Sequence, residues 1–208
     1  MKSFSEFLKN NLDESAAQGP HHLAMFDIDG TTAIPHDVYV HVLDHTNNRV
    51  ASLSHSEFNQ HNLKPGQKYD FSDFRSSEKF AKSKPIMRVV QKIKKLSEKG
   101  NRVAFNTARA DFDNKDEFLN TFRNKFGLDI DKMHVHRAGN IPGDKPIAEK
   151  KADIVRSSIQ KGNYKHVSLY DDDTKNLDQF LALKNEYPHI NFNAHHVDHN
   201  GRFKKYTG

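Results

Sequence analysis

The chain has 208 residues, a formal net charge of +5, 35% hydrophobic residues and no cysteine. This length can bury a full α/β core, and one domain plus an insertion is the natural expectation. Without cysteine, disulfides and thiolate chemistry are excluded. No apolar run approaches the roughly 20 residues that cross a bilayer, and the first residues lack the hydrophobic centre of a signal peptide. We therefore expect a cytoplasmic protein with no membrane partner, and the oligomeric state stays open.

The first residues predict a short helix or tail that precedes the domain. Phe4, Phe7 and Leu8 have helical spacing, and the segment then becomes polar and ends at Gly19 and Pro20. The tail is expected to cover residues 1–19, and its sequence indicates no function.

The next segment is a short apolar run, residues 23–26, followed by the sequence D-x-D-G-T from Asp27 to Thr31. The run predicts a strand whose last side chains lie at its carboxyl end, where open α/β sheets bind ligands. Carboxylates two residues apart on extended backbone point the same way, so Asp27 and Asp29 can meet one substrate. This arrangement suits phosphoryl transfer, with Asp27 as nucleophile and Asp29 as acid and then base. A calcium loop is excluded, because the twelfth position from Asp27 is Val38.

An insertion with a different pattern is expected over residues 35–83. Alternating apolar residues at 38–43, the turn residues Asn47 and Asn48, and a resumed strand at 50–53 predict a hairpin. Ser54 and Glu57 form a capping-box pair that opens a short helix. A turn at residues 64–66 precedes an aromatic cluster of Tyr69, Phe71 and Phe74.

The α/β rhythm returns after the insertion. Helices are expected at 86–99, around 118–126, from Lys151 onward and at 177–184, and strands at 102–105, 133–136, 166–170 and 190–194. The second of these helices ends at Gly127. The pattern predicts an α/β fold with a doubly wound, Rossmann-like, mostly parallel sheet, helices on both faces, and a small hairpin-containing cap inserted after the first strand. The core would comprise residues 20–34 and 84–208, and the cap residues 35–83.

Two later strands also end in polar groups. The strand at 102–105 runs into Asn106, Thr107, Ala108 and Arg109, and the strand at 166–170 runs into Asp171, Asp172 and Asp173, with Asn176 shortly after. With D-x-D-G-T, these strand ends resemble, in the same order, the motifs of the haloacid dehalogenase superfamily.

The resemblance implies specific roles. Asp27 would carry an aspartyl-phosphate and Asp29 would be the acid and base. Thr107, with Asn106, would bind the phosphate. A lysine between the second and third motifs would neutralise the phosphate and the nucleophile: Lys151 fits best, because Ile154, Val155 and Ile159 continue its buried helix face, and Lys150 and Lys145 are reserve candidates. Magnesium would be bound by Asp27, Asp172 and the backbone carbonyl of Asp29. Asp171, Asp173, Asn176 and Arg109 are further candidates.

The acid at position 29 favours phosphate-ester hydrolysis, because an alkoxide leaving group needs a proton whereas a halide does not. The sequence therefore predicts a magnesium-dependent phosphatase that hydrolyses a phosphate monoester.

The substrate is less closely defined. The opening M-K-S-F-S-E-F-L and the segment from Glu57 to Phe74 resemble phosphatase-like proteins of large tailed bacteriophages. This resemblance implies a nucleotide or nucleic-acid phosphate, and a host cytoplasm as the site of action. Residues 79–102 carry nine basic residues and one acid, most of which we expect on a solvated helix face, although a strip that attracts a polyanion is an alternative. Three alternatives stay open: a 3′-end polynucleotide phosphatase, a small nucleotide or sugar monophosphatase, and a non-catalytic protein that binds a partner through a phosphate site.

Overall fold

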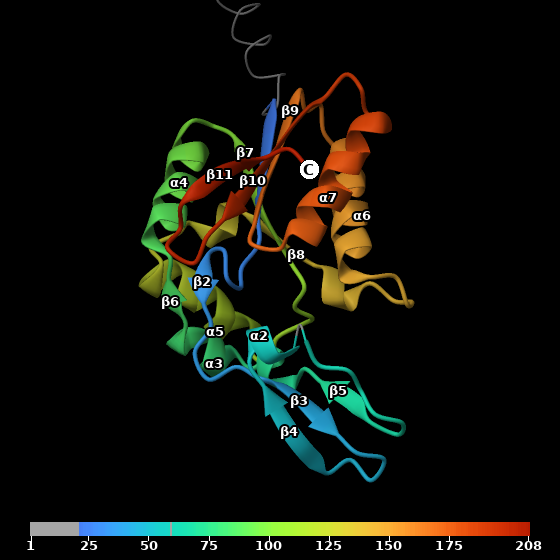
Figure 1. The fold of residues 1–208 in the computed structure, drawn as a ribbon. Helices are drawn as coiled ribbons and strands as arrows, with labels where there is room; N and C mark the ends of the chain where they lie inside the picture. The colour runs from blue at the N-terminus through green and yellow to red at the C-terminus, as the bar shows by residue number, and fades with distance from the viewer. Residues whose placement is uncertain (1–20, 59) are drawn as a thin grey trace, which may run out of the picture.

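The computed structural model describes residues 21–58 and 60–208, so the helix expected in the tail lies outside the described residues. The core is a six-stranded sheet in the order β11-β10-β9-β1-β7-β8 (Figure 1). Its strands are β1 (His22–Phe26), β7 (Arg102–Thr107), β8 (His134–Arg137), β9 (His166–Asp171), β10 (Asn191–Val197) and β11 (Phe203–Tyr206). The first five run parallel, and β11 pairs antiparallel with β10.

The strand order places β1 in the centre, between β7 and β9. The chain builds one side of the sheet through β7 and β8, and then returns to build the other side through β9 and β10. The point beside β1 where this order reverses is where doubly wound sheets bind their ligands. Phe26 is in register with both Phe105 and Tyr170, so the three central strands end at the same level.

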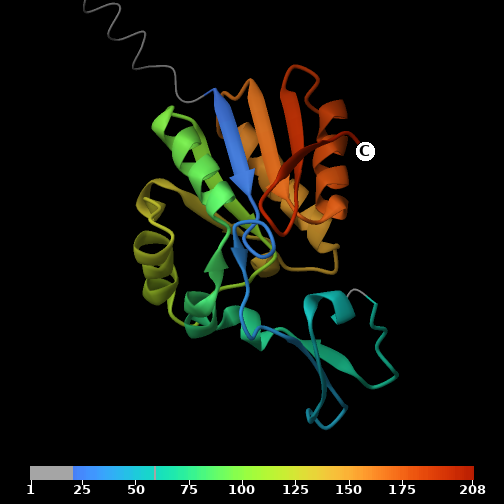
Figure 2. The same ribbon diagram turned by 60° about the vertical axis from the view of Figure 1, so that its left-hand side comes forward.

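Helices cover both faces of the sheet (Figure 2). One face is covered by α4 (Met87–Glu98), α5 (Lys115–Asn120) and the π-helical turn η2 (Thr121–Lys125), and the other by α6 (Ile147–Gln160) and α7 (Thr174–Ala182). Successive residues of β1 point to opposite faces: Ala24 and Phe26 join the first core layer, and Leu23 and Met25 the second. Because both faces are buried, the strand is continuously apolar. The predicted doubly wound α/β fold is confirmed.

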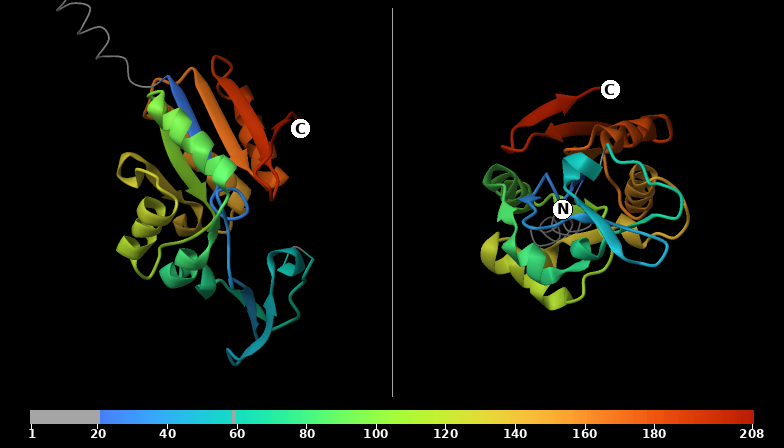
Figure 3. Two further views of the ribbon diagram at one scale, coloured as in Figure 1. Left: turned by 90° about the vertical axis from the view of Figure 1, so that its left-hand side faces the viewer. Right: turned by 60° about the horizontal axis from the view of Figure 1, so that its bottom comes forward.

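The segment between β1 and α4 forms a second, smaller sheet. A short ladder of β2 (Ala33–Ile34) with β6 (Lys84–Pro85) closes its base. Beyond this ladder, β3 (Val40–Leu43), β4 (Arg49–Leu53) and β5 (Lys68–Asp70) form an antiparallel sheet in the order β4-β3-β5, with the short helix α2 (His55–Phe58) beside it. Figure 3 shows this sheet projecting beyond the carboxyl ends of the core strands. The predicted hairpin is present as β3 and β4, and β5 was not predicted.

The short helix expected after the hairpin is observed as α2, and the capping-box pair of Ser54 and Glu57 opens it as expected. The backbone N–H of Ser54 donates to Oε2 of Glu57 at 2.7 Å, which is the reciprocal bond of a capping box.

The projecting segment ends earlier than expected from the sequence. After η1 (Ser72–Arg75), helix α3 (Ser77–Lys82) packs on the core, because the fully buried ring of Phe80 contacts four other phenylalanine rings: Phe112, Phe118, Phe122 and Phe126. The boundary expected at residue 83 therefore assigns α3 to the cap, although this helix packs on the core. The ring of Phe80 is the one aromatic side chain of α3, and a single apolar ring in a polar stretch is a weak sequence signal for a core helix.

The strand β11 was not predicted, and the other core helices and strands lie within a few residues of their expected positions. Short 3₁₀ turns occur at η3 (Ile130–Lys132), η4 (Ala138–Asn140) and η5 (Leu183–Asn185). Within residues 21–58 and 60–208, no helix combines the length and the apolar character needed to cross a bilayer.

Candidate active site

Three carboxylates meet at the carboxyl ends of β1 and β9. One oxygen from each of Asp27, Asp171 and Asp172 lies within 4.8 Å of the others, and Asp27 and Asp171 are buried. The backbone N–H of Asp27 donates to the carbonyl of Tyr170 at 2.9 Å, so the ladder between the two strands continues to the cluster. The cluster therefore lies at the switch point of the sheet.

The turn after β1 fits closely around Asp172. Gly30 has a φ of 80°, and a Cβ at this position would lie 2.7 Å from Cγ of Asp172. Both the backbone conformation and the space require glycine. The hydroxyl of Thr31 donates to Oδ1 of Asp172 at 3.0 Å. Thr31 was not among the predicted site residues, although its place in D-x-D-G-T could have suggested a role.

Lys151 is the lysine that reaches the cluster. Its Nζ donates to Oδ1 of Asp27 at 2.6 Å and to Oδ2 of Asp171 at 2.9 Å, and its side chain is 3% exposed. Lys145 instead forms an ion pair with Asp153 at 2.9 Å on the surface of α6. Lys150 is buried, but no contact with the carboxylates is observed for it in the described structure.

The cluster carries more negative charge than Lys151 neutralises. Burial, together with the neighbouring carboxylates, raises the pKa of Asp27, although Lys151 opposes this. Burial and the charge of Asp171 raise the pKa of Asp172 to about 6. For Lys151, burial lowers the pKa, but Asp171 and Asp27 outweigh it and raise the pKa overall, so the ammonium stays protonated.

Asn106 and Thr107 end β7 beside the cluster, and they make different contacts. The amide of Asn106 is fully buried and donates from Nδ2 to the carbonyl of Lys151 at 3.0 Å. Asn106 thus holds the backbone that carries Lys151, and its predicted contact with phosphate stays a prediction. Oγ1 of Thr107 accepts a hydrogen bond from the backbone N–H of Arg109 at 3.2 Å. This bond does not use the hydroxyl proton, which can be donated to a phosphate oxygen.

Arg109 binds Asp29 rather than the acidic cluster. Its Nε and Nη2 donate to the two oxygens of Asp29 at 2.7 and 2.6 Å, and Nη1 donates to the carbonyl of Phe74 at 2.6 Å. The guanidinium is buried, and it lies 5.2–5.3 Å from the ring centroids of Phe74, Phe80 and Phe112. Arg109 therefore links the predicted general acid to the base of the projecting segment.

The two remaining acidic-motif candidates act within their own loop. Oδ1 of Asp173 accepts from the backbone N–H of Lys175 at 2.9 Å, which caps α7. Nδ2 of Asn176 donates to Oδ1 of Asp171 at 2.9 Å. Since Lys151 binds the other oxygen of Asp171, this carboxylate is held on both sides.

The donor set suits a hard divalent cation such as magnesium. Carboxylate oxygens are the ligands that Mg²⁺ prefers, and three lie close together here. Burial and neighbouring carboxylates raise the pKa values of Asp27 and Asp172, and a cation beside them would favour their charged forms. Asp27 and Asp172 would hold the ion. The expected contribution of the Asp29 carbonyl stays a prediction.

Fold and site together define a doubly wound α/β protein with an acidic, lysine-containing cluster at its switch point. No family model matches the sequence, and no curated protein matches it. Among solved structures, a similar chain is the HAD domain of the effector protein Lem4 from Legionella pneumophila. It is 12% identical, with 89% of this chain and 90% of that chain covered, and the TM-score is 0.46. No inference about activity follows from a similarity of this size.

Proposed function

We propose that this protein is a magnesium-dependent phosphatase of the haloacid dehalogenase type, which hydrolyses a phosphate monoester through an aspartyl-phosphate on Asp27. The observation that carries the proposal is the contact of the buried Asp27 carboxylate with the Lys151 ammonium at 2.6 Å, inside a cluster of three carboxylates. A purely structural ion pair does not need two further acids beside it.

The residues divide the chemistry as follows. A carboxylate oxygen of Asp27 attacks phosphorus, and the bond to the leaving oxygen breaks. Lys151 and the hydroxyl of Thr107 stabilise the negative charge on the equatorial oxygens. Asp29 protonates the leaving oxygen and then removes a proton from the water that hydrolyses the acyl-phosphate, which regenerates Asp27. A bound Mg²⁺ supplies further positive charge for the phosphate oxygens.

The substrate we propose is a nucleotide or nucleic-acid phosphate. The net charge of +5 favours an anionic substrate. Phe71 in the projecting segment is 46% exposed and lies against the rings of Phe58, Tyr69 and Phe74, which offers an aromatic surface to a base.

The nucleophile is tested by Asp27→Asn. Because an amide cannot form an acyl-phosphate, hydrolysis of an aryl phosphate in the presence of Mg²⁺ should fall about a thousandfold or more, with the thermal unfolding temperature retained. Acid quenching of the wild-type protein during turnover should show one phosphoryl group on the peptide that contains Asp27, by mass spectrometry. Asp29→Asn should still form this adduct with a good leaving group.

Asp144→Asn is the matched control, since Asp144 is exposed and lies outside the cluster. Wild-type turnover in Asp27→Asn, or a phosphoryl group on another residue, would remove Asp27 from the mechanism. A panel of 3′-phosphorylated oligonucleotides, nucleoside monophosphates and sugar phosphates then tests the substrate class. Equal kcat/KM across this panel would contradict the nucleotide proposal and leave the phosphatase proposal intact.

A further inference from the structure

Four basic side chains surround a hollow on the sheet face that α6 covers, beside β1, β7 and β8. Arg102 begins β7, His134 and His136 lie on β8, and Lys161 follows α6. Together with Leu23, Ala104, Ser158, Gly162, Asn163 and Tyr164, they line a cavity of about 580 Å³, which we call the basic hollow. This volume is in the range of small-molecule sites.

Within residues 21–58 and 60–208, no counter-ion is observed for the cations of the basic hollow. No acidic residue lines it. Within the described part of the chain, the side chains of Arg102 and Lys161 have no hydrogen bond or ion pair, although Arg102 is partly buried. By contrast, the guanidinium groups of Arg109 and Arg156 are paired with carboxylates. An unpaired, partly buried guanidinium beside a second cation attracts an anion.

The pKa values of the two imidazoles in the basic hollow are lowered by burial and by the neighbouring cations. The rings of His134 and His136 are stacked, with centroids 5.8 Å apart. Burial, together with His134, Lys161 and Arg102, lowers the pKa of His136 to about 4. Burial and Arg102 lower the pKa of His134. At neutral pH the hollow therefore presents two cations and two neutral imidazoles, each of which can donate one hydrogen bond.

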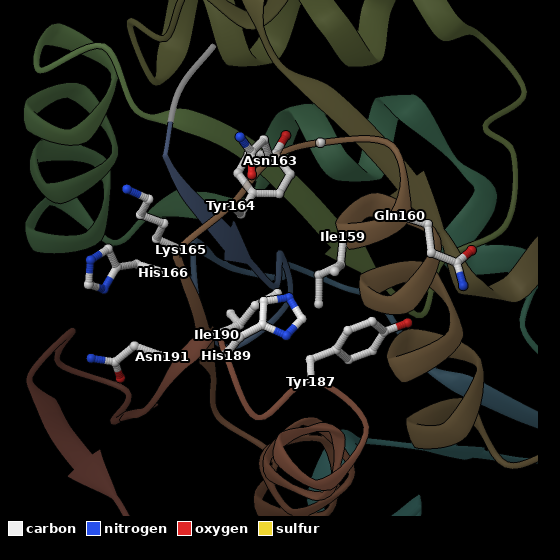
Figure 4. A pocket seen from close by; sticks show the side chains of 11 residues that line it. Ile159, Gln160, Asn163, Tyr164, Lys165, His166, Tyr187, His189, Ile190 and Asn191 are labelled. Atoms are coloured by element: carbon white, nitrogen blue, oxygen red, sulfur yellow. The ribbon is translucent and has the colours of Figure 1, made fainter. Parts of the chain in front are cut away.

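A second hollow of about 640 Å³ adjoins the first, and the two share Gly162, Asn163 and Tyr164. Figure 4 shows the rings of Tyr187 and His189 close to Ile190 in this second hollow. Ile159 and Ile190 give it apolar surface, and no acidic residue lines it. An organic group attached to an anion in the basic hollow can therefore extend into this neighbour.

We propose that the basic hollow is a second ligand site, which binds a phosphate group carried by a small organic molecule or by a nucleic-acid strand. The guanidinium of Arg102 matches the geometry of phosphate oxygens, and Lys161 adds a point charge. The site goes beyond the proposed function, because its lining contains none of the three clustered carboxylates and its occupancy requires no catalysis.

The direct test uses the two imidazoles as reporters. In the inactive Asp27→Asn protein without Mg²⁺, the pKa values of His134 and His136 are followed by NMR during titration with inorganic phosphate, a nucleoside monophosphate or a single-stranded oligonucleotide. A bound anion favours the imidazolium, so the pKa of His136 should rise from about 4. The acidic cluster contains neither Arg102 nor Lys161, so a shift that depends on these two cations assigns the binding to the basic hollow.

Two substitutions test the cations. Arg102→Gln and Lys161→Gln should each weaken binding of the responding probe about tenfold, because each removes a charged hydrogen-bond donor. Lys204→Gln, at an exposed position of β11 on the opposite edge of the sheet, makes the same charge change and should leave the affinity unchanged. Lys161 is exposed, so its substitution keeps the test valid if Arg102→Gln fails to fold.

The probes distinguish the source of the phosphate. A response to inorganic phosphate or to the nucleotide assigns the site to a small phosphorylated ligand, and a response to the oligonucleotide alone assigns it to a strand backbone. Unchanged imidazole pKa values with all three probes would overturn the proposal. Because the protein used is inactive, this result is independent of whether the phosphatase proposal holds.

Discussion

The guanidinium of Arg109 holds the carboxylate of Asp29 in place by two hydrogen bonds. Both oxygens of Asp29 accept hydrogen bonds from Arg109, which is the geometry of an ionised carboxylate. To protonate a leaving group, Asp29 must give up part of this contact. Arg109 also binds the carbonyl of Phe74, so its position depends on the residues that follow the projecting sheet. Arg109 is thus a positioning residue for the proposed acid.

This role predicts a dependence on the leaving group. Arg109→Lys keeps the charge but loses the two-point contact with Asp29. It should lower kcat/KM for alkyl phosphates about ten- to a hundredfold, because their leaving oxygen needs a proton, and change kcat/KM for p-nitrophenyl phosphate much less. The measurement is the ratio of the two values in variant and wild type.

Arg137→Lys is the matched control for this ratio. Arg137 also lies over phenylalanine rings, those of Phe112 and Phe118, but its carboxylate partner is Asp111. An equal loss with both classes of substrate in Arg109→Lys would show that Arg109 supports the fold or the phosphate instead of the acid.

At the scale of secondary-structure elements, two features attach the projecting segment to the core. One is the ladder of β2 with β6, and the other is the buried carboxylate of Asp73. Oδ2 of Asp73 accepts from the backbone N–H of Tyr39 at 3.0 Å and from Nζ of Lys79 at 2.6 Å. Nε2 of the buried His41 lies 3.3 Å from the same oxygen. Asp73 therefore joins the strand β3 to the core helix α3, and it must be kept in any shortened protein.

The segment beyond this attachment is predicted to select the substrate. Replacing residues 42–70 with a short linker keeps Tyr39 and His41 as partners of Asp73. It should leave hydrolysis of p-nitrophenyl phosphate within about threefold of wild type, because the candidate catalytic side chains come from the core. Hydrolysis of the best substrate in the nucleotide panel should fall at least about tenfold, since contacts to the leaving group are lost. The measurement is kcat/KM for both substrates.

The shortened protein must first show the far-ultraviolet circular dichroism expected for an intact core. Proportional loss of both activities in a folded protein would show that the segment takes part in catalysis itself, and would contradict its role as a selector.

For the molecule as a whole, the sequence predicted those elements whose pattern reflects burial on both faces. The strands β1, β7 and β9 are apolar runs that stop at polar residues, so their ends and their shared edge could be inferred. The strands β5 and β11 lie at sheet edges and contain no fully buried residue, so no apolar pattern marks them.

The site shows a similar limit. Lys150 and Lys151 are consecutive and both buried, and only the start of α6 at Ile147 and its docking on the sheet decide which one faces Asp27. Asp171 and Asp172 likewise make different contacts, with Lys151 and Thr31, because consecutive residues at a strand end point in different directions. The pairing of Asp29 with Arg109 depends on residues 80 positions apart, which local patterns do not encode.

The stability of the whole molecule should carry a pH dependence that originates in the acidic cluster. The pKa of Asp172 is raised to about 6 by burial and by Asp171, whereas an unfolded aspartate titrates near about 3.9. Because the pKa of Asp172 is higher in the folded state, the folded protein binds a proton at this carboxyl more tightly than the unfolded chain does. The free energy of unfolding is therefore unaffected by this group below about pH 4, and it decreases as the pH rises toward 6.

Removing the charge should reverse this loss. In the absence of metal, Asp172→Asn should be more stable than wild type by about 1–3 kcal/mol at pH 7.5, and the difference should vanish near pH 4. Urea denaturation at several pH values measures it, with Asp144→Asn as an exposed control expected to match wild type throughout. Saturating Mg²⁺ should stabilise the wild-type protein and have little effect on Asp172→Asn, because a cation that binds only the folded state adds its binding free energy to stability. A wild-type protein whose stability, relative to Asp172→Asn, is independent of both pH and Mg²⁺ would show that the three carboxylates do not repel one another and would remove the electrostatic reason for a cation at this edge of the sheet.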